Sequence, residues 1–132
     1  VSIGSYACSG VISPELYRRL AAQGANVLTN SASLTVFAQS RNYHEQTRSM
    51  VRFHAAANDK PFIQATKGGE GLIIDRTGTI QERSDNNLDL LQSEVDTTST
   101  KTLYTTIGEA FLFVSALNIS LLLIRNRRGD SS

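Results

Sequence analysis

The stretch from Val1 to Leu20 constrains the fold most, because it predicts a strand, a tight turn and a helix in immediate succession. β-branched and aromatic side chains fit a pleated sheet, and those that favour a buried strand here are Val1, Ile3 and Tyr6. The tripeptide Ser13–Glu15 predicts a helix start, with serine as N-cap, proline in the first turn and glutamate near the positive end of the helix dipole.

Cys8 is the only cysteine, and it lies between the predicted strand and the approach to the helix N-terminus. This setting favours the thiolate, which is the nucleophilic form of cysteine. A single cysteine is also often a small buried hydrophobic residue, so both interpretations stay open on local context. One cysteine excludes an internal disulfide and a cysteine-based zinc site.

The 132 residues suit one domain of modest size, and a hydrophobic content of 40% is enough for a packed core. The net charge of +1 gives no strong field for attracting nucleic acid, so we expect no nucleic-acid partner. The chain opens with Val1, directly in a predicted core strand, and without a leader sequence. We therefore expect a piece of a longer protein.

A second strand, Ala25–Thr29, follows the first helix, which we expect over about residues 14–23. A strand, a helix and a strand at this spacing predict a βαβ unit with parallel strands. The stretch Asn30–Asn42 is rich in serine and asparagine and predicts a loop at the edge of the sheet that also carries Cys8. The apolar residues that could anchor this loop are Leu34, Val36 and Phe37.

The clearest helix is predicted over Tyr43–Asn58, where apolar residues recur every three or four positions. His44 and His54 lie ten residues apart, too far for a pair of metal ligands one helical turn apart. We expect structural or surface roles for both histidines, and we assign no metal or cofactor to the chain.

An antiparallel meander is predicted after this helix, with strands at Phe62–Thr66 and Leu72–Asp75. The glycine-rich segment Lys67–Gly71 lacks the spacing of a phosphate-binding loop, so a hairpin turn is the better interpretation. The polar stretch 82–102 follows, and the leucines that could add one more strand are Leu88, Leu90 and Leu91.

The stretch Ile107–Ile124 is apolar on every helical face and carries one charge, Glu109; the sequence RNRR follows it. The length is at the lower limit for a membrane-spanning helix, and the arginines would place the C-terminus in the cytoplasm and the domain outside. The alternative is a buried terminal helix. The expected organisation is a domain over 1–95, a linker over 96–103, a terminal apolar helix over 104–128 and a tail over 129–132.

Five segments in this order resemble the C-terminal part of the nitrilase (carbon–nitrogen hydrolase) superfamily, and within it the bacterial apolipoprotein N-acyltransferases. They are the strand ending at Cys8, SPELYRRLAAQGANVLTN, RSMVRFHAAANDKPFIQAT, GGEGLIIDRTGTIQ and the closing LYTTIGEAFLF with its apolar run and RNRR. The resemblance covers nearly the whole chain. It implies the second half of an α-β-β-α sandwich, followed by a terminal apolar transmembrane helix.

The resemblance also implies that Cys8 takes an acyl group from a phospholipid as a thioester and passes it to the N-terminal amine of a lipoprotein. The domain would lie on the outer, periplasmic side of the bacterial cytoplasmic membrane. The superfamily's glutamate base and its oxyanion-stabilising lysine precede the cysteine, yet none of the seven residues before Cys8 is Glu or Lys. The chain alone would then lack both groups, and we assign them to none of Glu45, Lys67 or Glu70.

Two departures from the N-acyltransferase pattern surround the expected site. Ser9 and Gly10 stand where an aromatic residue and a glutamate are usual, and SASLTVF (31–37) stands where Asn-Asp-Ala-Trp-Phe is usual. Two alternatives therefore stay open beside the acyltransferase. One is a soluble-type amidase or nitrilase acting on small carbon–nitrogen substrates, and the other is an inactive relative with a binding or scaffolding role.

Overall fold

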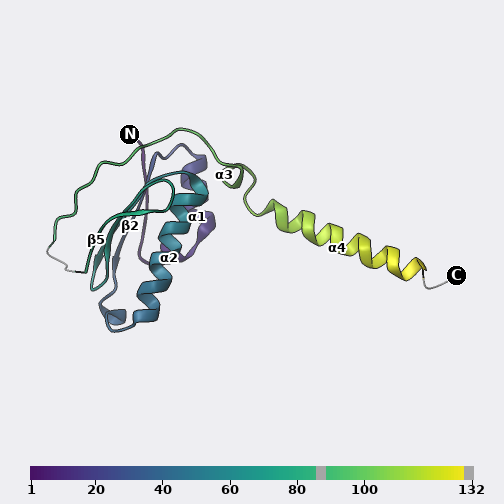
Figure 1. The fold of residues 1–132 in the computed structure, drawn as a ribbon, viewed down its shortest axis with the longest axis horizontal. Coiled ribbons are helices and arrows are strands. Elements are labelled where there is room, and N and C mark those ends of the chain that lie inside the picture. Colours follow the sequence, from purple (N-terminus) through teal and green to yellow (C-terminus); the bar gives the residue numbers. More distant parts are fainter. Residues whose placement is uncertain (86–88, 130–132) are drawn as a thin grey trace.

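The computed structural model describes residues 1–85 and 89–129, and its centre is a five-stranded mixed sheet (Figure 1). The strands lie side by side in chain order: β1 (Ile3–Ala7), β2 (Val27–Ser33), β3 (Phe62–Lys67), β4 (Gly71–Ile74) and β5 (Ile80–Ser84). The first three strands are parallel, and β4 and β5 continue the sheet in antiparallel fashion. This confirms the predicted βαβ unit and the hairpin turn at Lys67–Gly71.

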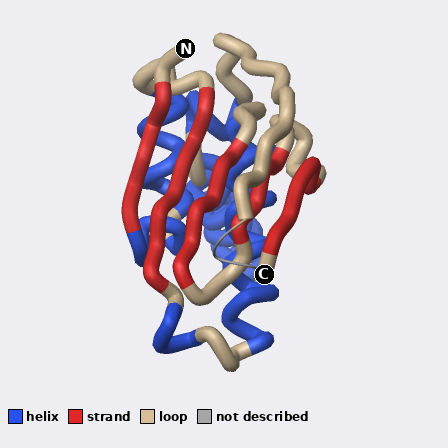
Figure 2. Tube along the Cα trace, turned by 90° about the vertical axis from the view of Figure 1, so that its left-hand side faces the viewer, coloured by secondary structure: helices blue, strands red, loops and turns tan. Residues whose placement is uncertain are grey.

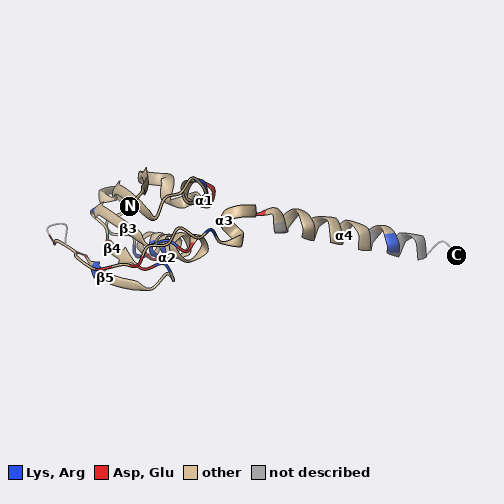
Figure 3. Ribbon diagram, turned by 90° about the horizontal axis from the view of Figure 1, so that it is seen from above, with Lys and Arg blue, Asp and Glu red and all other residues tan. Residues whose placement is uncertain are grey.

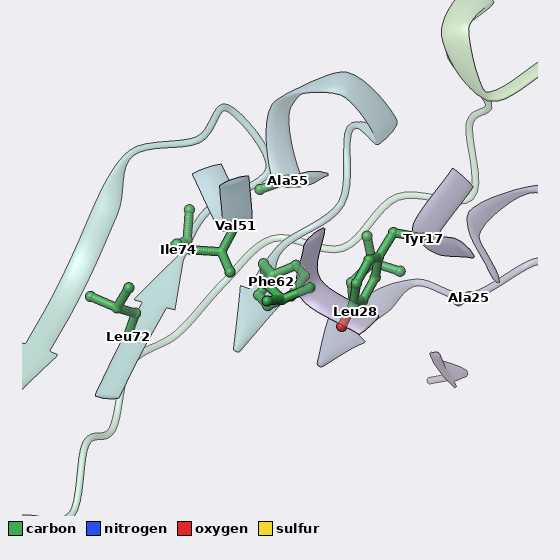
Figure 4. Packing of buried hydrophobic residues seen from close by; sticks show 9 residues of the cluster. Tyr17, Ala25, Leu28, Val51, Ala55, Phe62, Leu72 and Ile74 are labelled. Atoms are coloured by element: carbon green, nitrogen blue, oxygen red, sulfur yellow. The ribbon is translucent and has the colours of Figure 1, made fainter. Parts of the chain in front are cut away.

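Two helices, α1 (Pro14–Ala22) and α2 (Arg41–Asn58), cover one face of the sheet (Figure 2). Both agree with the predicted helices, although α2 begins two residues earlier than expected. The core lies between these helices and the sheet (Figure 4). Its fully packed members are Val11, Tyr17, Ala25, Leu28, Val51, Ala55, Phe62, Leu72 and Ile74.

The expectation that β1 is a buried strand is wrong for Val1 and Ile3, which are exposed. Along a strand, alternate side chains point to opposite faces of the sheet. Gly4 and Tyr6 lie on the face that the helices cover, whereas Ile3, which is 66% exposed, lies on the other. The pattern of apolar residues predicted the strand, but it did not show which face the helices would cover.

Strand β2 extends four residues beyond the predicted end at Thr29, to Ser33. Its parallel pairing with β3 runs from Leu28 opposite Phe62 to Ser33 opposite Lys67, so the ladder includes the polar residues that suggested a loop. The expected loop is reduced to a short 3-10 turn, η2 (Thr35–Phe37), which leads into α2. Of the three proposed anchors, Leu34 is buried, whereas Val36 and Phe37 are exposed.

Strand β5 covers the start of the polar stretch, to Ser84, and residues 89–102 contain no further strand. Leu88 lies outside the described residues, and Leu90 and Leu91 lie in a segment without helix or strand. The chain then crosses back to the helices as a strap, which we define as residues 98–105. Lys60 is buried, and its Nζ donates to the carbonyl oxygens of Thr98 and Thr100 at 2.8 and 2.6 Å.

Two helices, the first of which overlaps the end of the strap, stand in place of the single terminal helix expected over 104–128. Helix α3 (Leu103–Ile107) ends at Gly108, and α4 (Ala110–Gly129) starts in a new direction. Gly108 has φ +58, which disfavours a side chain, and a Cβ there would lie only 3.0 Å from Nε of Arg18. Arg18 also donates to the carbonyl of Thr105 at 2.9 Å, so α1 fixes this corner.

Helix α4 projects away from the sheet and its covering helices (Figure 1), and its described apolar side chains are exposed. The interpretation as a helix buried in the domain core is therefore wrong. Between Glu109 and Arg125 the helix carries no charged residue (Figure 3). In the part of the chain that the structure describes, no helix has both the length and the apolar character needed to cross a membrane.

Lys60→Met should loosen the strap and lower the free energy of unfolding by about 1–3 kcal/mol, because two hydrogen bonds from a buried charged donor to carbonyls of the strap are lost. Urea unfolding in detergent measures this change. Lys67→Met is the matched control, since Lys67 is exposed at the end of β3 and should change the value by less than about 0.5 kcal/mol. Equal values for the two variants would contradict the role of Lys60.

Candidate functional site

Cys8 is exposed, and it is the first residue after β1, at the start of the 3-10 turn η1 (Cys8–Ile12). Its backbone has φ +51, in the left-handed region that residues with side chains seldom adopt. Such a conformation stores about 1–3 kcal/mol of strain and persists only where surrounding contacts hold it. The structure thus places the thiol where the sequence predicted, at the carboxyl end of a parallel strand, in a conformation that the sequence did not predict.

The side-chain amide of Asn30 holds the end of β1 and the first residue of this turn. Its Nδ2 donates to the carbonyl oxygens of Tyr6 and Cys8 at 3.0 and 3.3 Å. It also donates to the hydroxyl of Tyr17 at 3.2 Å, and that hydroxyl donates to the carbonyl of Thr29 at 3.2 Å. Asn30 is 2% exposed, so these bonds form away from water.

His54 holds the far end of η1. Its Nε2 lies 2.6 Å from the carbonyl oxygen of Val11, and because a carbonyl only accepts, Nε2 carries the proton. The ring stacks on Tyr17 at a centroid distance of 4.5 Å and is fully buried. Burial lowers the pKa of His54, outweighing the opposite effect of the bond to Val11. The histidine is therefore neutral, and it has the structural role that we expected.

At Gly10 the backbone of the turn passes so close to Tyr6 of β1 that there is no room for a side chain. A Cβ at this position would lie 2.8 Å from the Cβ of Tyr6, closer than two such atoms can pack. The carbonyl of Gly10 accepts a hydrogen bond from the N–H of Ser13 at 3.1 Å, and α1 begins at the next residue. Ser13 occupies the N-cap position as predicted, but its hydroxyl makes no capping bond. The residue that departs from the N-acyltransferase pattern thus suits the local backbone.

A polar cleft of about 630 Å³ lies near the carboxyl ends of β2 and β3. In it the buried carboxylate of Glu70 pairs with Arg48 and Arg83, and Glu45 pairs with Arg41 on the helix surface. These ion pairs involve both carboxylates. The lining residues are Ala38, Gln39, Arg41, His44, Glu45, Arg48, Gly68, Gly69, Glu70, Arg83 and Asp85, and Cys8 is not among them.

The two histidines lie in unlike surroundings. His44 is on the exposed start of α2, with Nε2 3.2 Å from the carbonyl of Ala38, whereas His54 lies in the core. Within residues 1–85 and 89–129, no three side chains of the metal-binding types gather closely enough to hold a metal ion.

These features define an α/β domain that presents an exposed cysteine at the carboxyl end of a parallel strand. The chain belongs to the carbon-nitrogen hydrolase family, whose sequence model matches residues 1–104. Apolipoprotein N-acyltransferase 1 of Treponema denticola is 32% identical to it over 109 residues, covering 77% of this chain. The chain spans only 20% of that relative's length.

Solved structures show the same fold. A carbon-nitrogen hydrolase from Helicobacter pylori G27 superposes with a TM-score of 0.64 at 19% identity, covering 71% of this chain and 40% of that protein. Saccharomyces cerevisiae Nit3, a member of branch 10 of the nitrilase superfamily, has a TM-score of 0.53 at 17% identity, covering 62% and 32%. The mixed α/β domain is thus of the nitrilase type.

Sequence reasoning missed Asn30 and the contact of His54 with the turn. Asn30 looked like the first residue of a polar loop, because the serines after it concealed the continuing strand. His54 did give a signal, since it falls within the apolar stripe of α2, but from the sequence we expected only a structural or surface role for it. Its partner Val11 is 43 residues away, so spacing could not identify it.

Stability should fall as the pH drops below about 6.5, because the unfolded chain then takes up a proton at His54 that the folded chain resists. Because the pKa of His54 is lower in the folded chain, its neutral form contributes fully to stability above pH 6.5. This contribution is lost as the pH falls from 6.5 toward the pKa of the folded state. His54→Gln keeps an N–H donor without titrating, so its free energy of unfolding should vary less with pH, by up to about 1.4 kcal/mol per pH unit.

Urea unfolding between pH 7.5 and 5 measures both slopes. His44→Gln is the matched control, because it makes the same substitution at a half-buried position outside the core. A His54→Gln slope equal to that of the wild type would show that burial of His54 does not set the pH dependence.

Proposed function

We propose that this chain is the part of a membrane-associated N-acyltransferase that carries the nucleophile, Cys8. The observations that support this most are the 32% identity to an apolipoprotein N-acyltransferase over 109 residues and the exposed cysteine on a strained turn. The substrates that we propose are a phospholipid as acyl donor and the N-terminal amine of a lipoprotein as acceptor.

In the first step, the thiolate of Cys8 attacks the carbonyl carbon of a phospholipid ester. A carbon–sulfur bond forms and the ester carbon–oxygen bond breaks. The leaving oxygen takes the proton that a general base removed from the thiol, so a lysophospholipid departs as an alcohol. The thioester divides one difficult acyl transfer into two easier steps.

In the second step, the free α-amine of the lipoprotein attacks the thioester carbon. A carbon–nitrogen bond forms, the carbon–sulfur bond breaks, and the proton lost by nitrogen returns Cys8 to its thiol. A base and an oxyanion donor are needed in both steps. Since the relative is about five times as long as the region that it shares with this chain, we propose that both groups come from a preceding half of the domain.

We further propose that α4 holds the domain against the outer face of the bacterial cytoplasmic membrane. The exposed apolar residues from Leu112 to Ile124 and the absence of charge between Glu109 and Arg125 support this assignment. Arginines at the end of the helix suit the headgroup region. The same exposure favours a membrane enzyme over the soluble-type amidase, for which a helix packed into a core would be expected.

Incubation of the full-length protein with phosphatidylethanolamine in detergent should add one fatty acyl mass to Cys8, because the thioester is the proposed intermediate. Intact-mass analysis followed by peptide mapping locates the adduct. Cys8→Ala should lose the adduct completely. The absence of any adduct on the wild type, under conditions where the Treponema denticola relative is acylated, would refute acyl transfer by this chain.

The double variant Leu117→Lys, Leu121→Lys should leave the membrane fraction, because two charges would enter the apolar surface of α4. Flotation with lipid vesicles measures the bound share, and we expect a loss of at least tenfold. Leu90→Lys is the control, since Leu90 is 90% exposed and lies outside α4. If the double variant floats as well as the control, α4 is not the membrane contact.

A further inference from the structure

We propose that Asn30 is the residue that positions Cys8 for acyl transfer. The inference rests on the proposed function, and it assigns to Asn30 a role that touches neither substrate nor the reacting atoms. Asn30 acts through the backbone, because its amide binds the carbonyl groups of Tyr6 and of Cys8 itself. It is a positioning residue rather than a catalytic one.

The first argument is where the main-chain ladder between β1 and β2 ends. Tyr6 lies opposite Asn30 and Ala7 opposite Ser31, and no ladder partner follows for Cys8. With φ +51, Cys8 cannot continue an extended strand, so its carbonyl leaves the ladder. The amide of Asn30 donates a hydrogen bond to that carbonyl at 3.3 Å. A side chain of β2 therefore contacts the backbone one residue beyond the ladder, at the nucleophile itself.

The second argument is the imbalance within the Asn30 side chain. Its Nδ2 has two hydrogens and three acceptors within 3.3 Å, whereas Oδ1 is buried without a hydrogen-bond partner among the described residues. A buried acceptor without a partner destabilises a fold by about 1–3 kcal/mol. Leucine has the same number of side-chain heavy atoms, branched at the same carbon, and no such penalty, so packing alone does not require an amide here. The N–H donors of this side chain, which bind carbonyls of Tyr6 and Cys8, are therefore what distinguishes asparagine from leucine here.

The neighbouring strand offers a matched comparison. Gln64 lies opposite Asn30 in the β2–β3 ladder, is 3% exposed, and also has a buried carbonyl oxygen without a partner among the described residues. No described hydrogen bond joins Gln64 to the Cys8 turn. Replacing either amide by leucine therefore removes a similar buried polar group, and only one replacement removes the contact to the nucleophile's backbone.

The test compares Asn30→Leu, Asn30→Asp and Gln64→Leu in the full-length protein. The rate of acyl-thioester formation is measured against the concentration of phosphatidylethanolamine in mixed micelles, and thermal unfolding is followed in parallel. Asn30→Asp has nearly the shape of asparagine but loses the amide donors. It serves as the second variant if Asn30→Leu prevents folding. Both Asn30 variants should lower the maximal acylation rate at least tenfold with KM within twofold of the wild type.

Gln64→Leu should keep the maximal rate within threefold of the wild type. Suppose that the wild type forms the acyl-thioester and that the folded Asn30 variants form it as fast as Gln64→Leu does. This result would overturn the positioning role and leave the proposed function intact. Loss of rate in Gln64→Leu equal to that in the Asn30 variants would also overturn it, because the effect would then belong to the core in general. A wild type that forms no thioester would remove the proposed function and this inference together.

Discussion

Burial of Tyr17 is the constraint on which the rest of the domain depends. Its ring is inaccessible to solvent and contacts the rings of Tyr6, His54 and Phe62, so one side chain of α1 joins β1, α2 and β3. Burial raises the pKa of Tyr17 to about 12, which keeps the hydroxyl protonated and able to donate to the strand β2. Both groups that hold the Cys8 turn, the amide of Asn30 and the ring of His54, are in contact with this tyrosine.

The sequence was sufficient for the order of elements, because the strand–helix–strand spacing and the stripe on α2 are local patterns. It was insufficient wherever a partner lies far along the chain. Asn30 meets carbonyls 22 and 24 residues away, and a polar residue within a polar stretch carries no sign that its strand continues. The exposure of Ile3 was hidden for a related reason, since alternation predicts two faces but not which of them the helices cover.

The connection to α4 shows a further limit of sequence reasoning. Most bonds that hold the strap end on backbone carbonyls, as those from Lys60 to Thr98 and Thr100 do, and any residue supplies a carbonyl. The threonine-rich composition therefore suggested only a linker. Because Arg18 of α1 holds the carbonyl of Thr105, the base of α4 is tied to the helix that directly follows the Cys8 turn.

The magnitudes explain why the conformation of Cys8 belongs to the assembled domain and not to its local stretch. A left-handed residue with a side chain stores about 1–3 kcal/mol, whereas one ordinary hydrogen bond contributes about 0.5–1.5 kcal/mol. One such bond offsets only part of this range, whereas the bonds from Asn30 to Cys8 and from His54 to Val11 together contribute about 1–3 kcal/mol, which is of the same order as the strain. These two residues come from β2 and α2, which Tyr17 packs into one core. The turn can relax only if those elements separate, so the strained thiol persists for as long as the core is intact.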